Sequence, residues 1–222
     1  MRPKTLDHVA FWVQDRDSIV DVATTRLGMH VIDRQDAFTL VGSDARRGKL
    51  TLFTAEGPRE RGAIKHVALR VNDVERARAA LGNGGDSAAL PEGIEIRLVE
   101  ATTEVDYDLD HVALYTPAPE ETAAQYLELG FNPAESNAGA PRVEVGGAFV
   151  EFHEGEPGDP ERPLLNHLAV LVDSADEHTA EAERLGIVDR VVDAANTRAV
   201  FVWGPDRVRI EYVEHKPEFA LS

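Results

Sequence analysis

The most informative absence in this chain of 222 residues is cysteine, which does not occur at all. Without a thiol there is no disulfide, no cysteine nucleophile and no thiolate metal site. Lysine is also scarce, because the 23 basic residues comprise four Lys and therefore 19 Arg, against 40 acidic residues. The net charge of −17 repels nucleic acid and anionic membranes, since binding to either requires clustered cations.

Long apolar runs are missing as well. No stretch approaches the roughly 20 apolar residues that cross a bilayer, and the N-terminus MRPKTLDHVA has no signal-like apolar segment. We therefore expect a cytoplasmic protein. The hydrophobic fraction of 43% is ordinary for a folded chain, and this length can bury the core of one large domain or of two smaller ones.

Four similar strands are the most prominent feature that is present. Each begins with a histidine followed by alternating apolar residues: LDHVAFWV, IKHVALRV, LDHVALYT and LNHLAVLV, which contain His8, His66, His111 and His167. His8 and His111 are 103 residues apart, and His66 and His167 are 101 apart. This repeat predicts two similar halves, residues 1–104 and 105–222, each made of two smaller units.

Each unit has the same order of predicted elements. A helix follows each His strand, at about 17–27, 73–81, 120–131 and 174–187, and three short strands then complete the unit. The second unit is abbreviated, because little room is left for strands between residues 85 and 94. The sequence thus predicts an α+β fold of β-α-β-β-β units, with helices on one face of a sheet and a concave face opposite.

Strand alternation puts polar side chains on that concave face. Glu151 shares a face with His153, and Glu211 shares one with Arg209, while the apolar residues between them point the other way. Imidazole and carboxylate together suit a divalent first-row metal. A single histidine at a strand start is more often a core residue, and we keep that interpretation for His8 and His66. His30, His178 and His215 are expected to be solvated.

At these residues the sequence resembles the vicinal oxygen chelate superfamily, which contains glyoxalase I, methylmalonyl-CoA epimerase, extradiol ring-cleaving dioxygenases and bleomycin-resistance proteins. The resemblance lies in the His-Val-Ala strand openings, in FVEFHEG (149–155) and in GPDRVRIEYVE (204–214). It implies four βαβββ modules, the second abbreviated, paired into two glyoxalase-like domains whose curved sheets form a cup. By this match, one divalent ion (Zn, Ni, Mn or Fe) is held by two residues of module three and two of module four: His111, Glu151, His167 and Glu211.

The first half lacks the corresponding carboxylates. Aligning it with the second half puts Arg97 opposite Glu211, and Thr51 or Leu52 opposite Glu151. An arginine would repel a metal ion. We therefore expect a degenerate site in the N-terminal domain (1–104) and the metal site in the C-terminal domain (105–222).

The first functional interpretation is metal-assisted proton transfer, of lyase or isomerase type, on a small carbonyl or hydroxycarbonyl substrate. The metal would act as a Lewis acid, and Glu151 or Glu211 would be the catalytic base. An alternative is non-catalytic binding of a small molecule, as in bleomycin-resistance-like proteins, although the four-residue set favours an enzyme. The expected partner is a small-molecule substrate rather than nucleic acid or membrane, and paired modules are compatible with a homodimer.

A second alternative is an extradiol ring-cleaving dioxygenase acting on a catechol-like substrate. The resemblance implies an iron site of two histidines and one carboxylate, which His111, His167 and Glu211 would satisfy. In that group a Tyr acid precedes the Glu by ten residues and an acid–base His lies further upstream. Phe201 and Val192 stand at those positions here, which counts against ring cleavage.

Overall fold

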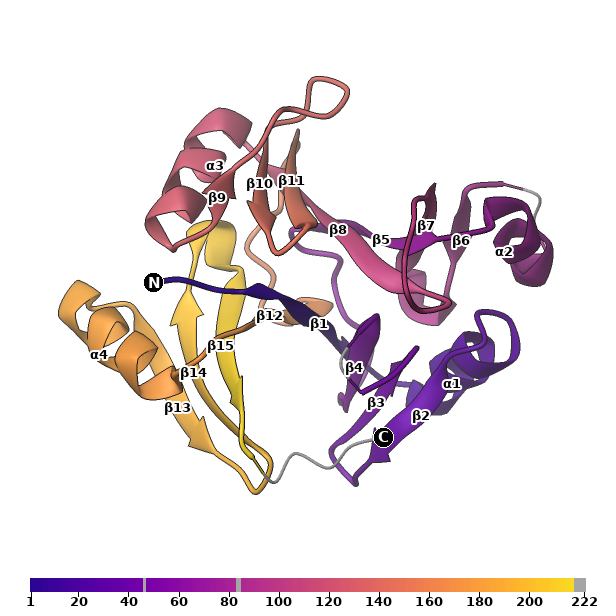
Figure 1. Cartoon of the computed structure of the whole chain (residues 1–222), viewed down its shortest axis with the longest axis horizontal. Coiled ribbons are helices and arrows are strands. Elements are labelled where there is room, and N and C mark those ends of the chain that lie inside the picture. The colour runs from indigo at the N-terminus through magenta and orange to yellow at the C-terminus, as the bar shows by residue number, and fades with distance from the viewer. Residues whose placement is uncertain (46, 83–84, 218–222) are drawn as a thin grey trace.

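The chain folds into four successive modules in the computed structural model, which describes residues 1–45, 47–82 and 85–217 (Figure 1). Module one comprises β1 (Thr5–Val13), α1 (Arg16–Thr25), β2 (His30–Arg34), β3 (Phe38–Gly42) and β4 (Lys49–Thr54). Module two comprises β5 (Ile64–Val71), α2 (Val74–Leu81), β6 (Ser87–Ala89), η1 (Pro91–Gly93) and β7 (Glu95–Glu100). Module three comprises β8 (Asp108–Thr116), α3 (Pro119–Glu128), β9 (Asn132–Pro133), β10 (Arg142–Val145) and β11 (Ala148–Glu154). Module four comprises β12 (Leu165–Leu171), α4 (Ala175–Leu185), β13 (Val188–Asp193), β14 (Thr197–Trp203), η2 (Pro205–Arg207) and β15 (Arg209–His215).

The predicted α+β modules are confirmed, including the abbreviated second one, in which two strands rather than three follow the helix among the residues described. Local capping explains the helix ends. Ser174 begins α4, and its side chain accepts a hydrogen bond from the backbone N–H of Glu177. Gly186 ends the same helix with φ of +70°, a conformation that glycine adopts without steric cost.

The modules pair in a nested order rather than in two consecutive halves. β1 pairs antiparallel with β12, so modules one and four form an eight-stranded sheet, the first sheet. β5 pairs antiparallel with β8, so modules two and three form a seven-stranded sheet, the second sheet. The predicted division into residues 1–104 and 105–222 therefore does not match the two sheets. A sequence repeat shows which modules are alike, but the same repeat is compatible with either pairing.

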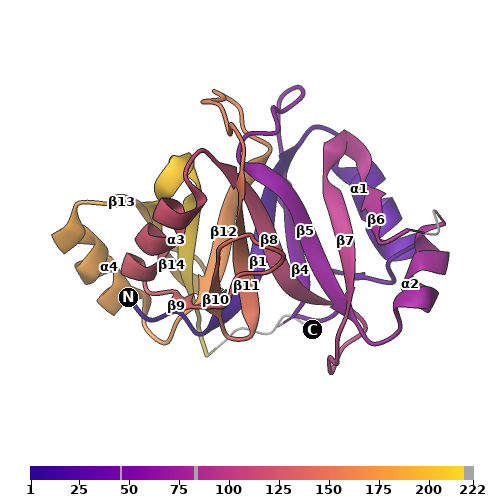
Figure 2. The same cartoon turned by 90° about the horizontal axis from the view of Figure 1, so that it is seen from above.

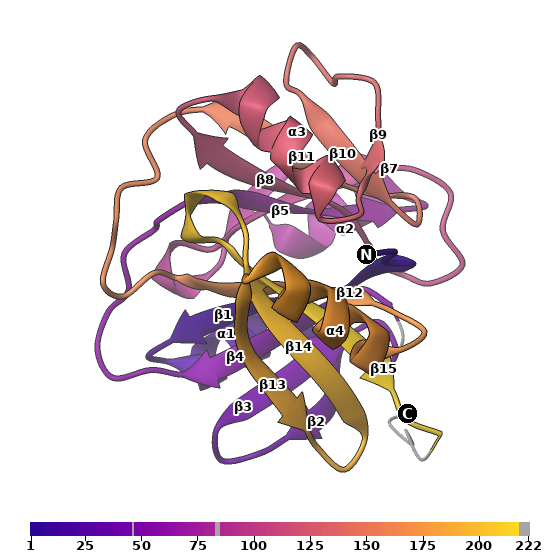
Figure 3. The same ribbon diagram turned by 90° about the vertical axis from the view of Figure 1, so that its left-hand side faces the viewer.

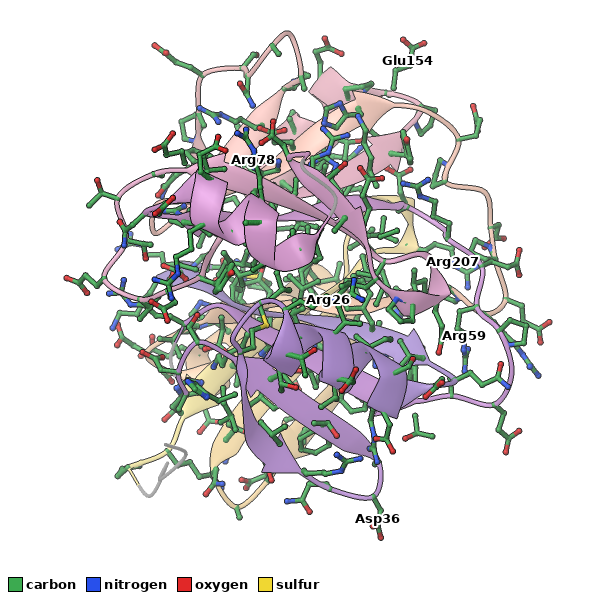
Figure 4. The ribbon with its side chains drawn as sticks, turned by 90° about the vertical axis from the view of Figure 1, so that its right-hand side faces the viewer. Arg26, Asp36, Arg59, Arg78, Glu154 and Arg207 are labelled. Atoms are coloured by element: carbon green, nitrogen blue, oxygen red, sulfur yellow. The ribbon has the colours of Figure 1, made fainter. Side chains whose placement is uncertain are left out.

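The two sheets occupy opposite halves of the molecule. In Figure 1 the second sheet runs across the upper half and the first sheet across the lower half. Figure 2 shows α3 and α4 on one flank and α1 and α2 on the other, and Figure 3 looks directly at the α3 and α4 side. On the opposite side, Arg26 at the end of α1 lies at the junction with α2 (Figure 4), where it lines a small cavity together with Arg76.

One continuous apolar core joins all four modules. Tyr126 of α3 and Tyr212 of β15 are both fully buried in it. The Tyr212 hydroxyl donates a 2.7 Å hydrogen bond to the Leu129 carbonyl, which ties module four to the end of α3. The core thus lies under the helices and leaves the opposite face of each sheet for polar groups.

Candidate functional site

A β-bulge lies immediately before each of the four strand-opening histidines. The pairing of β1 with β12 skips Asp7 and Asn166, and the pairing of β5 with β8 skips Lys65 and Asp110. An extra residue in one strand re-aims its side chain. The bulged residue can therefore reach the ring of the histidine that follows it, which regular alternation would prevent.

Three of these bulged residues hold a histidine ring. The Nδ1 atoms lie 2.8 Å from Asp7 Oδ2 in His8, 2.7 Å from Asp110 Oδ1 in His111 and 3.0 Å from Asn166 Oδ1 in His167. Because carboxylate and amide oxygens accept hydrogen bonds, each Nδ1 carries the proton and donates it. Nε2 then turns toward the polar face of the sheet, as it does in histidines that bind metals.

The first cluster consists of His8, His167 and Glu211, which come from β1, β12 and β15 of the first sheet. The two Nε2 atoms are 3.0 Å apart, and Glu211 Oε2 lies 2.9 Å from Nε2 of His167 and 3.3 Å from Nε2 of His8. One ligand atom from each residue lies within 4.8 Å of the others. Among the described residues no other group of three meets that criterion.

The residues of the first cluster shift one another's pKa values. Burial would raise the pKa of Glu211, but the neighbouring His167 and His8 outweigh it and lower the pKa to about 2. Burial would lower the pKa of His8, but hydrogen bonds to Asp7 and Glu211 outweigh it and raise the pKa to about 9. For His167 burial prevails, and its pKa is lowered. The cluster therefore holds an ionised carboxylate and one neutral imidazole at neutral pH.

Behind His8 stands a buried ion pair. Both Asp7 oxygens accept hydrogen bonds from Lys49 Nζ, at 3.0 and 2.9 Å, and both side chains are almost completely buried. Nε2 of His215 also lies 3.1 Å from Asp7. Burial would raise the pKa of Asp7, but the charge of Lys49 keeps it well below its usual value. Asp7 thus joins β1, β4 and β15 directly behind a candidate metal ligand.

Aromatic rings enclose the first cluster on the polar face of the sheet. Phe201 contacts the His167 ring edge-on with the centroids 5.1 Å apart, and Phe53 lies 6.0 Å from the same ring. Trp12 follows at 5.4 Å from Phe53. These rings limit access of water to the histidines and strengthen electrostatic interactions inside the cluster.

The second cluster consists of His66, His111, Glu151 and His153 in the second sheet. Nε2 of His66 lies 3.0 Å from Nε2 of His111, and the two rings meet at 76°, close to the 74° of the first cluster. Glu151 Oε2 is 3.6 Å from Nε2 of both His111 and His153. The second cluster therefore repeats the histidine pair but not the compact arrangement of the carboxylate.

Strand register shows which residues correspond in the two clusters. Arg97 is paired with Ala68 as Glu211 is paired with Ala169, so the alignment of Arg97 with Glu211 agrees with the structure. Thr51 is paired with Ala10 as Glu151 is paired with Ala113, which selects Thr51 over Leu52. At the four corresponding positions each cluster thus has two histidines and one carboxylate, with Thr51 in the first cluster or Arg97 in the second at the remaining position.

The four predicted metal ligands do not converge on one point. His167 and Glu211 lie in the first sheet, whereas His111 and Glu151 lie in the second, because module three pairs with module two and not with module four. His8, interpreted from sequence as a structural histidine, completes the first cluster. Its signal was present in the sequence, since it opens its strand with the same His-Val-Ala motif. The ligand role of all these residues stays a prediction.

Two further histidines differ from the sequence expectation of solvated side chains. His178 is buried, and its ring stacks on Tyr212 with the centroids 5.3 Å apart. His215 is half-buried and contacts Asp7. His30 is exposed, as expected. The His215 contact depends on how modules one and four meet, whereas the His178 contact depends on how α4 packs on β15 within module four.

Comparison with known proteins identifies the fold. Residues 5–92 match the family model described as the Glyoxalase/Bleomycin resistance protein/Dioxygenase superfamily. No curated protein sequence matches the chain. Among solved structures, the chain is similar to a Bacillus subtilis protein whose assignment as a dioxygenase is provisional, with 14% identity, 99% of this chain and 87% of that chain covered, and a TM-score of 0.81.

Glyoxalase I from Zea mays is also similar, with 16% identity, 95% of this chain and 92% of that chain covered, and a TM-score of 0.72. The cppA protein of Streptococcus pneumoniae has 13% identity over 96% of this chain and 98% of that chain, with a TM-score of 0.61. The predicted resemblance is confirmed, and the chain has the vicinal oxygen chelate fold of glyoxalases and dioxygenases. Within the described residues, no helix is both long and apolar enough to span a membrane.

Proposed function

We propose that the protein is a metal-dependent enzyme whose centre is the first cluster, and that it acts on a small molecule with two neighbouring oxygen atoms. The observation that carries this proposal is the convergence of two imidazole nitrogens and one carboxylate oxygen within 4.8 Å. Two histidines and one carboxylate with open coordination positions are typical of non-haem Fe(II) oxygenases. The geometry therefore favours an oxygenase of the ring-cleaving type.

The donor set fits a divalent metal ion on three counts. Asp7 and Asn166 fix both rings so that Nε2 faces the cluster. Glu211 is ionised without any metal, because its histidine neighbours lower its pKa. Three protein ligands leave coordination positions free, as catalytic sites do and closed structural sites do not.

A bound metal would supply a Lewis acid that holds two substrate oxygens together and leaves room for a further ligand. The chain's own residues do the rest. Nε2 of His8 and Nε2 of His167 would hold the metal ion. Asp7 and Asn166 keep the Nδ1 protons of these two rings in place, and Phe201 and Phe53 exclude water. A cavity of about 290 Å³, lined by Trp12, Asn166, Trp203 and Arg209 among others, lies beside the amide that holds His167, on the side of the ring away from its Nε2.

Metal-assisted proton transfer is the second candidate. It is favoured by Phe201 and Val192, which provide no acid or base at the positions where ring-cleaving enzymes are expected to have them. It is disfavoured by the single carboxylate, because Thr51 occupies the register position of a second Glu and leaves Glu211 as both ligand and base. The base predicted from sequence at Glu151 belongs to the other cluster.

The test begins with metal content. Metal-free protein is loaded anaerobically with Fe(II), or with Zn²⁺, and the bound metal is counted by elemental analysis. We expect the wild type to hold metal at the first cluster. Loss of a residue that only hydrogen-bonds a metal ligand typically lowers metal affinity roughly 10–100-fold. Glu211→Gln removes a ligand itself, so it should lower the metal affinity by more than that. Glu151→Gln is the matched control and should leave this binding unchanged.

Turnover then separates the candidates. Oxygen uptake by the Fe(II) form with a catechol supports the oxygenase, and solvent deuterium exchange into a small α-hydroxyketone without oxygen uptake supports proton transfer. A protein that binds these molecules without turnover is a binding protein. The proposal is wrong if wild-type protein takes up no metal, or if Glu211→Gln binds metal as the wild type does.

A further inference from the structure

The second cluster differs from the first in one consistent direction. Where the first sheet has Glu211, the second has Arg97 at the same register position. Where Asn166 accepts the Nδ1 proton of His167, the bulged residue before His66 is Lys65, which can only donate. Both replacements turn an acceptor or a negative charge into a cation. Such replacements repel a metal ion and attract an anion.

Positive charge exceeds negative charge around the second cluster. Lys65 interacts electrostatically with Arg97, Arg61, Glu95 and Glu151, and a fourth cation, Arg142, lies 3.7 Å from Glu151. Four cations thus face three carboxylates, those of Glu95, Glu151 and the Asp110 that holds His111, although the whole chain has a net charge of −17. Burial and the charge of Arg97 lower the pKa of Lys65, so these cations are held together against their mutual repulsion.

The carboxylate inside the second cluster is already satisfied. Asn137 Nδ2 donates a 2.8 Å hydrogen bond to Glu151 Oε1, and Arg142 adds an ion pair at the same oxygen. Glu95 likewise serves two guanidinium groups, at 3.2 Å from Arg97 and 3.7 Å from Arg61. The remaining positive charge belongs to Lys65 and the guanidinium groups at the rim, where Arg97 is 44% exposed and accessible to a ligand.

Buried imidazole nitrogens at the cluster have unused hydrogen-bonding capacity. His66 is 1% exposed, and within the described part of the chain its Nδ1 has no hydrogen-bond partner. The same holds for Nε2 of His153, whose contact with Glu151 at 3.6 Å is too long for a hydrogen bond. A neutral His66 has one N–H, on Nε2, which it donates to Nε2 of His111, so the contacts to a ligand at this cluster fall to the surrounding cations.

We propose that the second cluster is an anion site that takes a small carboxylate or phosphate, with Arg97 and Lys65 as its charged contacts. Arg97 is the main contact, because its planar fork matches the oxygens of either group. The molecule then has one site for a metal ion and one for an anion at corresponding positions of its two sheets. This inference does not depend on the metal at the first cluster.

Binding is tested on full-length, chelator-treated protein by NMR titration of the histidine side chains, with His66 assigned from His66→Gln. The probes are inorganic phosphate and acetate at constant ionic strength, with chloride as the reference anion. We expect saturable shifts of the His66 and His111 resonances with one or both probes and little change at His167. The probe that saturates first identifies the preferred group, phosphate or carboxylate.

Arg97→Glu should weaken binding at least tenfold, and Arg97→Gln should do so without reversing the charge in case the first variant unfolds. Arg184→Glu on α4 makes the same charge change far from the cluster and should bind as the wild type does. The proposal is overturned if neither probe produces saturable shifts, or if both Arg97 variants bind normally. It is also overturned if wild-type protein holds a second equivalent of Zn²⁺ that Glu151→Gln removes.

Discussion

Removing the carboxylate behind His8 tests how the first cluster is held. Asp7→Leu abolishes the acceptor for His8 Nδ1 and breaks the buried ion pair of Asp7 with Lys49. Breaking a buried ion pair from one side costs about 3–5 kcal/mol of unfolding free energy. Loss of the partner that orients a metal-binding histidine lowers metal affinity roughly 10–100-fold, which is about 1.4–2.8 kcal/mol of binding free energy.

Two companion variants separate these effects. Asp7→Leu with Lys49→Met removes the buried cation together with the carboxylate, so the unfolding free energy should largely recover while metal affinity stays low. Asp7→Asn keeps an oxygen that can accept from His8, as Asn166 does for His167. It should therefore be less stable than the wild type but bind metal with nearly normal affinity.

Zn²⁺ affinity is measured by competition with a chromophoric chelator, and stability by urea unfolding of the metal-free protein. Asp110→Leu is the matched control, because Asp110 holds His111 in the second sheet in the same way. It should leave the affinity of the first cluster unchanged. The reasoning fails if Asp7→Leu binds Zn²⁺ as tightly as the wild type, or if Asp110→Leu weakens binding equally.

Three more predictions concern stability of the metal-free protein. The pKa of His8 is raised from 6.5 to about 9 in the folded state, so its contribution to the free energy of unfolding is complete below pH 6.5 and is lost as pH rises through about 9. Urea unfolding across this range should show that free energy decline, and His8→Gln should remove this pH dependence. Tyr212→Phe deletes the hydrogen bond to the Leu129 carbonyl and should cost about 1–3 kcal/mol, because that buried acceptor is left unpaired; a thermal midpoint equal to that of the wild type would contradict this. Gly146→Ala should destabilise more than Gly186→Ala in the same assay, because both glycines have positive φ but of the two only Gly146 would place its Cβ against a backbone oxygen, that of Lys4.

The sequence was sufficient to predict the modules because each carries its own signal, a histidine-led strand followed by an amphipathic helix. It was also sufficient to align Arg97 with Glu211, since that alignment depends only on positions within a module. The sequence was insufficient to predict which residues group together in the first cluster, because the residues of that cluster come from two modules. The spacings of 103 residues from His8 to His111 and 101 from His66 to His167 are as compatible with consecutive pairing as with nested pairing. The sequence therefore does not single out His8 as a ligand.

The hydrogen bonds that orient the histidine rings could not be predicted from the sequence, for a different reason. Regular alternation places Asp7 and His8 on opposite faces of a strand, and only the bulge brings both side chains together. A bulge of one residue leaves no clear mark in the apolar pattern. The repeated Asp-His and Asn-His pairs are the trace it leaves in this sequence.

The nested order of the modules also bears on synthesis at the ribosome. Residues 64–154 contain every strand that borders β5, β8 and β11, so the inner pair can assemble as soon as that stretch has emerged. The outer pair must wait, because β1 is made first and its neighbour β12 belongs to the last module. Until then β1 lacks the strand on one of its sides and exposes an unpaired edge. Joining β1 directly behind β15 by circular permutation would turn this longest-range pairing into a local one and should speed folding.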